Sequence, residues 1–196
     1  MTFADVDVEA TVKASASAFV GNLDDVEVSL VGGSPQTTLR FSDVRWSVGR
    51  GANSLELTYA GGSVGDRALV VPGMPSFEEG FRYFVMLNGS ANAFVPITYA
   101  ENGAWQSVTT RAGDEILVDA RGRVLLRTAS GRVFAREWFA PATAGADIAS
   151  TAPDFLRPVS VADFCDWVAK TAGGPAVDRP GGAAASGTGP SQAGDR

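Results

Sequence analysis

The chain has 196 residues, a formal net charge of −6 and a hydrophobic content of 45%. It contains no histidine and one cysteine, which excludes a serine–histidine triad, a histidine-ligated metal, an internal disulfide and a multi-cysteine zinc site. The balance is acidic and the arginines are scattered, so we expect no nucleic-acid partner, because nucleic-acid binding relies on clustered Lys and Arg. No apolar run approaches the length of a spanning helix, and we expect no membrane-spanning segment.

Hydrophobic and polar residues alternate from the start of the chain, and this period of two predicts a half-buried strand that continues to residue 20. One face of that strand would carry Val6, Val8, Ala10 and Val12. The opposite face would carry Asp5, Asp7 and Glu9. Three carboxylates at strand spacing supply the oxygen ligands that calcium prefers, so these three residues form a candidate metal site. The alternative is an ordinary solvated strand face.

The next strands are separated by glycine-rich turns. A break is expected at Gly21-Asn22, and alternation resumes over residues 26–30. Over residues 37–48 the apolar side chains switch from odd to even positions. Such a change of phase predicts a β-bulge near Ser42-Asp43, a device with which small barrels turn corners.

The most apolar run, residues 81–87, predicts a central strand that is covered on both faces, with Phe84 in the core. Asn88-Gly89 follows directly and predicts a hairpin turn. The partner strand, residues 94–99, contains Pro96, which restricts this strand to an edge or a bulge. Further short strands, punctuated by glycines in the manner of a β-meander, are expected at residues 105–108, 115–119, 123–127 and 132–135.

Composition divides the chain into four parts. Residues 1–139 form the predicted β-barrel domain, and residues 140–159, which are rich in Ala, Thr and Gly, predict a linker. A C-terminal helix is expected at residues 160–172. Residues 173–196 consist mostly of Gly, Ala, Pro and Ser, and this composition predicts a disordered tail because it offers too little apolar area to offset the entropy of ordering.

The expected helix begins with a recognisable cap. Ser160 and Asp163 resemble a capping box, in which Asp takes the place of the usual Glu or Gln. An apolar stripe that includes Phe164 follows, and so short a helix must dock on the barrel to be stable. Cys165 lies in the same stripe. Because the chain has no histidine to act as its base, we expect a buried structural thiol.

Three segments carry a family resemblance: LELTYAGG at residues 55–62, VPGMPSFEEG at residues 71–80 and YFVML at residues 83–87. This order of strand, Gly-Gly turn, VPG-x-P-x-F-x-x-G loop and apolar strand resembles exported bacterial domains with an OB-like β-barrel. Those domains occur in secreted or cell-surface proteins, some of them associated with matrixin-type metalloproteases, and most have no assigned activity. The resemblance implies a secreted or periplasmic bacterial protein and carries over no catalytic residue. No signal peptide is visible at the start of this chain.

Aromatic residues recur along the predicted strands and form a candidate ligand-binding face, as in barrels that bind sugars or single strands. The wider set is Trp46, Tyr59, Tyr83, Phe94, Tyr99 and Trp105. The residues selected for ligand binding are Trp46, Tyr59, Tyr99 and Trp105. The alternative is that these side chains belong to the core. Joint exposure of Trp46 and Trp105 on one concave face would favour binding, whereas separate burial would favour a structural role.

Several carboxylate groups are further candidates for chemistry. Asp24, Asp25 and Glu27 form a cluster at a turn. As for the first strand, the two interpretations are a calcium site and an ordinary solvated surface. The adjacent pairs Glu78-Glu79 and Asp114-Glu115 have the residue type needed for acid–base catalysis. Adjacent loop residues seldom converge on one substrate, so an ordinary turn is the favoured interpretation of both pairs.

Together these features predict a mainly β protein: a small antiparallel OB-like β-barrel with one docked C-terminal α-helix and a disordered tail. The expected function is a non-enzymatic, extracytoplasmic accessory or interaction module of a bacterium, with a protein or glycan partner, no cofactor and no catalytic residue. Two alternatives stay open. One is a carbohydrate- or peptide-binding barrel that uses the aromatic face, and the other is a hydrolase that uses a carboxylate pair.

Overall fold

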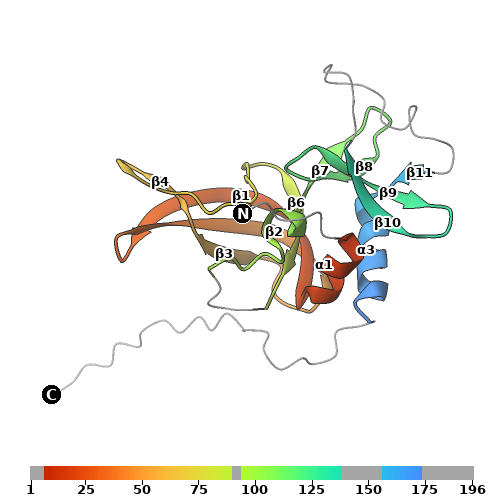
Figure 1. Ribbon diagram of the computed structural model, residues 1–196, viewed down its shortest axis with the longest axis horizontal. Coiled ribbons are helices and arrows are strands. Elements are labelled where there is room, and N and C mark those ends of the chain that lie inside the picture. The colour runs from red at the N-terminus through yellow and green to blue at the C-terminus, as the bar shows by residue number, and fades with distance from the viewer. Residues whose placement is uncertain (1–6, 90–93, 138–155, 174–196) are drawn as a thin grey trace.

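The computed structural model describes residues 7–89, 94–137 and 156–173 (Figure 1). Two α-helices and a short 3₁₀ turn accompany the strands: α1 (Val8–Ala14), η1 (Ala100–Gly103) and α3 (Val161–Thr171). The strands are β1 (Ser17–Val31), β2 (Ser34–Val48), β3 (Leu55–Ala60), β4 (Gly62–Val64), β5 (Arg67–Leu69), β6 (Arg82–Leu87), β7 (Ala104–Thr109), β8 (Glu115–Val118), β9 (Arg123–Thr128), β10 (Val133–Glu137) and β11 (Leu156–Pro158). The predicted mainly β class is confirmed.

Antiparallel pairing joins nine strands into one sheet in the order β10-β9-β8-β7-β6-β1-β2-β3, with β11 also paired to β9. Strands β4 and β5 form a separate hairpin. Strand β6 lies in the interior of this order, as its apolar sequence predicted. Within the described residues β3 and β10 are not joined, so the sheet is open rather than closed into a barrel.

The opening segment forms helix α1, so the predicted strand there is wrong. Asp7 is its N-cap, and the carboxylate Oδ1 accepts a hydrogen bond from the Glu9 amide at 3.2 Å. The buried residues of α1 are Val8, Thr11 and Val12. The spacing of these three residues is that of one face of a helix, although the same segment also alternates as a strand would. Packing against α3 and β10 stabilises the helix.

The bulge predicted near Ser42-Asp43 is confirmed in the pairing of β1 with β2. Val20 pairs with Arg45 and Asn22 with Ser42, so two residues of β2 lie opposite the single residue Gly21. A Cβ at Gly21 would lie only 3.1 Å from Val44 Cγ2 and 3.2 Å from the Ser42 carbonyl oxygen, so glycine allows the close approach of the bulged strand. Strand β1 continues through Gly21-Asn22, and the break predicted there is wrong.

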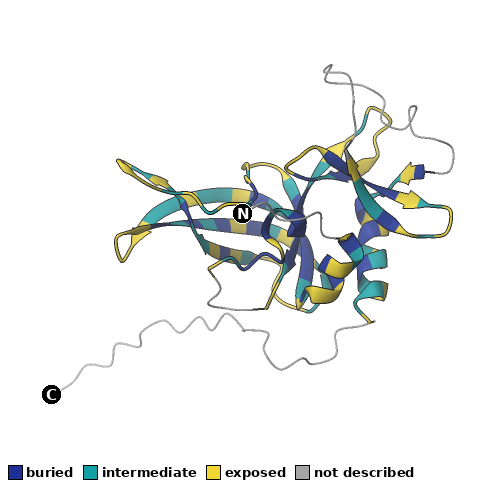
Figure 2. Cartoon of the chain, in the orientation of Figure 1, coloured by how far each residue is buried: buried dark blue, intermediate teal, exposed yellow. Residues whose placement is uncertain are grey.

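Strand β6 is buried on both faces and separates two hydrophobic clusters. Phe84 and Met86 point to the helix-side core, which also contains Val8, Val12, Trp105, Leu125, Phe164 and Val168. Tyr83 and Val85 point to the arm-side core, which also contains Phe19, Leu23, Leu39, Phe41, Val44 and Leu57. Figure 2 shows this burial at the junction of sheet and helices, whereas β1, β2 and β4 extend as an arm with exposed tips.

The segment after β6 returns antiparallel beside it, as the predicted hairpin requires, but only over residues 96–98: the Asn88 amide donates to the Pro96 carbonyl and the Thr98 amide to the Met86 carbonyl, both at 2.9 Å. Ile97 forms an isolated bridge with Leu87, and the chain then turns through Tyr99 and Ala100, whose φ values are 51° and 52°. A strand over residues 94–99 is therefore wrong. The left-handed turn at Tyr99 and Ala100 leads into η1 and ends the extended conformation.

The C-terminal elements confirm the predicted helix and its cap. Ser160 Oγ accepts a hydrogen bond from the Asp163 amide at 3.1 Å at the start of α3. The end of the predicted linker forms strand β11, which pairs with β9. Residues 140–155 of the linker and 174–196 of the predicted tail lie outside the described residues. Neither described α-helix is long and apolar enough to cross a membrane.

Candidate functional site

A cleft of about 410 Å³ lies between helix α3 and the sheet, and we call it the α3 cleft. Its apolar lining consists of Val20, Trp46, Val161, Ala162 and Ala169. Its polar and charged lining consists of Arg45, Ser47, Arg82, Glu115, Cys165 and Asp166. The volume falls in the range of small-ligand sites, about 300–1,000 Å³.

Small side chains on α3 explain why the space is open. Ala162, Cys165 and Ala169 recur at helical spacing along the side of α3 that borders the cleft. Phe164 and Val168, on the neighbouring side, are fully buried in the helix-side core. The large residues thus attach the helix to the sheet, and the small residues leave a gap beside that attachment.

The β-bulge determines which β2 side chains reach the cleft. Before the bulge, Leu39 and Phe41 point into the arm-side core, and an uninterrupted strand would place Arg45 on that same face. The bulge reverses the alternation, so that Val44 and Trp46 enter the arm-side core instead. Arg45 therefore faces the cleft side, beside its cross-strand partner Val20.

Arg82 brings a largely unused guanidinium group to the cleft. Its Nη1 lies 3.8 Å from Glu115 Oε2, which is longer than a hydrogen bond, and its side chain is 25% exposed. Its Nε is buried and has no hydrogen-bond acceptor among the described residues. A buried donor without an acceptor costs about 1–3 kcal/mol, and most such groups in proteins are satisfied.

Arg45 supplies a second positive charge. This side chain is exposed and makes no ion pair or hydrogen bond with any other residue that the structure describes. Glu115 and Asp166 balance the formal charge of the two arginines. The cleft therefore contains guanidinium N–H groups that can donate hydrogen bonds to a ligand, and its formal net charge is zero.

Cys165 is unsuited to nucleophilic catalysis. Burial raises the pKa of its thiol, and the hydroxyl of Ser47 and the positive charge of Arg82 oppose this shift only in part. A raised pKa keeps the sulfur protonated near neutral pH, whereas the nucleophile is the thiolate. The result agrees with the structural role expected from the sequence.

The aromatic residues selected for ligand binding do not share one face. Trp105 is fully buried in the helix-side core, where its Nε1 donates a hydrogen bond to the Asn102 carbonyl at 3.2 Å. Trp46 and Tyr59 pack against the arm-side core instead. Tyr99 is 43% exposed at the turn into η1 and belongs to neither hydrophobic cluster. The predicted aromatic face is not assembled.

The wider aromatic set divides in the same way. Tyr83 is buried and accepts a hydrogen bond at its hydroxyl from the Glu78 amide at 2.9 Å. Phe94 is 60% exposed. Neither residue extends the cleft, and among the residues that the structure describes Trp46 is the one aromatic residue in its lining.

The candidate metal residues are not gathered either. Asp5 lies outside the described residues, Asp7 caps α1, and Glu9 forms an ion pair with Lys13 at 2.6 Å. The strand face that would have aligned them is replaced by the helix. Across the parts of the chain that the structure describes, no group of three or more Asp, Glu, Cys or His side chains is arranged to hold a metal ion.

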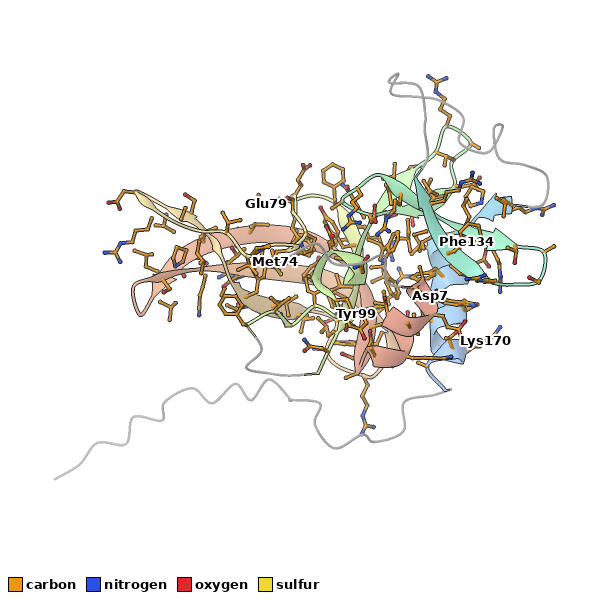
Figure 3. All side chains as sticks on the ribbon, viewed as in Figure 1. Asp7, Met74, Glu79, Tyr99, Phe134 and Lys170 are labelled. Carbon is orange, nitrogen blue, oxygen red and sulfur yellow. The ribbon has the colours of Figure 1, made fainter. Side chains whose placement is uncertain are left out.

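Three of the remaining candidate carboxylates, Asp25, Glu27 and Glu79, have structural partners. Arg40 pairs with Asp25, with Glu27 at 2.6 Å and with Glu56 at 3.4 Å. Glu79 accepts a hydrogen bond from the Val26 amide at 2.9 Å, and Figure 3 shows it over the β1–β2 side of the molecule. These contacts hold strands together and do not form an acid–base pair.

Sequence reasoning missed Arg45 and Arg82, although each left a signal. Arg82 is a charged residue at the start of a strand that is apolar on both faces, which is unusual for a fully covered strand. Arg45 follows the change of phase that revealed the bulge, and counting parity beyond that point would have placed it on the opposite face from Phe41. The contribution of α3 to the same site depends on tertiary packing.

No family model matches the chain, and no curated protein or solved structure matches it.

Proposed function

We propose that this chain is a non-enzymatic binding module whose ligand occupies the α3 cleft, and that it serves as an extracytoplasmic accessory or interaction module of a bacterium. The observation that carries the binding role is Arg82, whose guanidinium group borders the cleft with a buried Nε that lacks an acceptor. The assignment to a bacterial exported protein is supported only by the resemblance of residues 55–62, 71–80 and 83–87.

The free energy of an unpaired donor favours a binding role over a purely structural one. Leaving Arg82 without an acceptor lowers the stability of the free protein. A ligand oxygen that accepts from the guanidinium group of Arg82 offsets part of this cost. The cost in the free state thereby becomes part of the binding free energy.

The finer assignment to an OB-like barrel is part of the same proposal. The bulge in β2 and the bend that it introduces are devices of small barrels. The loop at residues 71–80 supports it by packing Met74 and Phe77 against the arm-side core.

The binding role can be tested by filling the cleft. Ala169→Leu places a larger side chain in the cleft wall, and Ala10→Leu on the exposed face of α1 is the matched control. Amide chemical shifts of each protein are recorded with a mixture of N-acetylated tripeptides and, separately, with a mixture of neutral oligosaccharides.

We expect one of the two mixtures to shift the amides of residues around the cleft in the wild type and in Ala10→Leu. The same shifts should be lost in Ala169→Leu, while its thermal unfolding stays cooperative. Shifts confined to the surface around Tyr99, or the same shifts in all three proteins, would place binding elsewhere and refute the assignment of the site.

A further inference from the structure

We infer that the α3 cleft recognises the carboxylate of a peptide, with Arg82 as the main anchor and Arg45 as the second cation. This inference rests on the proposed function and specifies its ligand. The planar guanidinium group matches the geometry of a carboxylate and forms paired hydrogen bonds with it, which a neutral ligand oxygen does not match.

The present partner of Arg82 leaves room for such a ligand. Glu115 approaches only to 3.8 Å and does not make a hydrogen bond with the guanidinium group. In contrast, the structural pair Arg123–Asp119 closes to 2.6 Å and is almost fully buried. Arg82 is therefore held near the cleft by a loose ion pair that an incoming carboxylate can supplement or displace.

The acidic residues of the cleft determine how the site discriminates. Glu115 and Asp166 repel an incoming anion, and the two arginines attract it. Glu115 competes directly because it faces Arg82, whereas no ion pair joins Asp166 to either arginine among the described residues. Removal of the Glu115 charge should therefore strengthen binding of a carboxylate and leave binding of an amide unchanged.

The lining favours a peptide over an acidic sugar. Sugar sites use open aromatic faces, and Trp46 offers little of its ring. Phe19 packs on this indole at 5.4 Å between ring centroids. A Cβ at Gly51 would lie 2.7 Å from its Cζ2 atom, so the Gly51 backbone also covers the ring. The walls formed by Val20 and Val161 suit an aliphatic side chain next to the carboxylate.

Three synthetic peptides separate the possible sources of the carboxylate: acetyl-Gly-Gly-Leu as the free acid, the same peptide as the C-terminal amide, and acetyl-Gly-Glu-Leu amide. Binding to the full chain is measured by calorimetry and by amide shifts around the cleft. We expect the free acid to bind about tenfold or more tightly than its amide. Equal binding of the Glu-containing amide would show that a side-chain carboxylate serves as well as a terminal one.

Charge variants connect this preference to the cleft. Arg82→Gln should reduce binding of the free acid to the level of the amide, and Glu115→Gln should increase it. Arg132→Gln, at an exposed turn outside the cleft, is the matched control and should leave binding unchanged. If Arg82→Gln fails to fold, Arg45→Gln provides the second test and should weaken binding of the free acid alone.

The outcomes separate the two proposals. Equal affinity for acid and amide at the cleft would overturn the carboxylate inference and leave the binding site intact. Amide shifts around the cleft with neutral oligosaccharides, and none with peptides, would also overturn the carboxylate inference and leave the binding site intact. Absence of cleft shifts with every probe of both experiments would overturn the inference and the proposed function together.

Discussion

The rings of Phe84 and Phe164 meet edge to face, with centroids 4.8 Å apart and planes at 67°. Phe84 belongs to the central strand β6, and Phe164 belongs to helix α3. Both side chains are fully buried, so this contact fixes the helix on the sheet at the deepest point of the helix-side core. It also positions the neighbouring residues of α3 that form one wall of the cleft.

We predict that Phe164→Ala and Phe84→Ala each lower the free energy of unfolding by about 3–5 kcal/mol, because each leaves a cavity that the rigid sheet cannot fill. Urea unfolding followed by circular dichroism measures the loss. Phe81→Ala, at a side chain that is 42% exposed, is the control and should cost far less. A cost below about 1 kcal/mol for both buried residues would show that α3 is not docked as described.

The sequence predicted most accurately the elements whose residue pattern is compatible with only one local structure. A strand in which every residue except Arg82 is large and apolar must be covered on both faces, and this is why residues 81–87 predict a central strand. The phase change before Val44 required a bulge, and Ser160 with Asp163 marked the helix start. In each case, local chemistry alone decided the structure.

The wrong predictions concern segments whose residue pattern fits two different local structures. The first helix fits both a period of two and a helical face, and only its packing on α3 and β10 distinguishes them. The strand face on which the candidate metal site depended is replaced by this helix from Asp7 onward. The cleft could not be predicted from the sequence either, because it forms where strands from four parts of the chain lie next to α3. No sequence motif indicates this tertiary contact.

A second prediction concerns the buried ion pair of Asp119 and Arg123. Their side chains are 1% and 9% exposed, and Arg123 also donates to Asn102 Oδ1 at 3.0 Å. Asp119→Ala leaves a positive charge buried without its main partner, so we expect the free energy of unfolding to fall by about 3–5 kcal/mol. The exposed Asp114→Ala, measured by the same urea unfolding, should change it by about 0.5 kcal/mol or less.

A third prediction concerns Arg40, whose ion pairs lie on the exposed face of the arm. Side-chain hydrogen bonds to Glu27 and Asp25 raise the pKa of this guanidinium group, but water and salt screen the attraction. Arg40→Gln should lower the urea midpoint slightly at low ionic strength and leave it unchanged at high ionic strength. A large loss that persists at high salt would show that the arm depends on this residue for its packing.

The last prediction concerns the thiol of Cys165, whose pKa is raised by burial. The unfolded chain loses the thiol proton first as pH increases, because its pKa is the lower of the two. The stability gained by burying the neutral thiol is therefore fully present below about pH 8.5, the ordinary thiol value, and is lost as pH rises towards the folded-state pKa.

Two measurements check this prediction. Cys165→Ala should show a smaller loss of unfolding free energy than the wild type between about pH 7.5 and pH 9.5, and the comparison removes the contribution of every other titrating group, which both proteins share. Labelling of the folded protein with a thiol reagent should also be slower than labelling of a free cysteine at neutral pH. Labelling at the rate of a free cysteine would mean that the thiol is open to solvent and that α3 does not shield it.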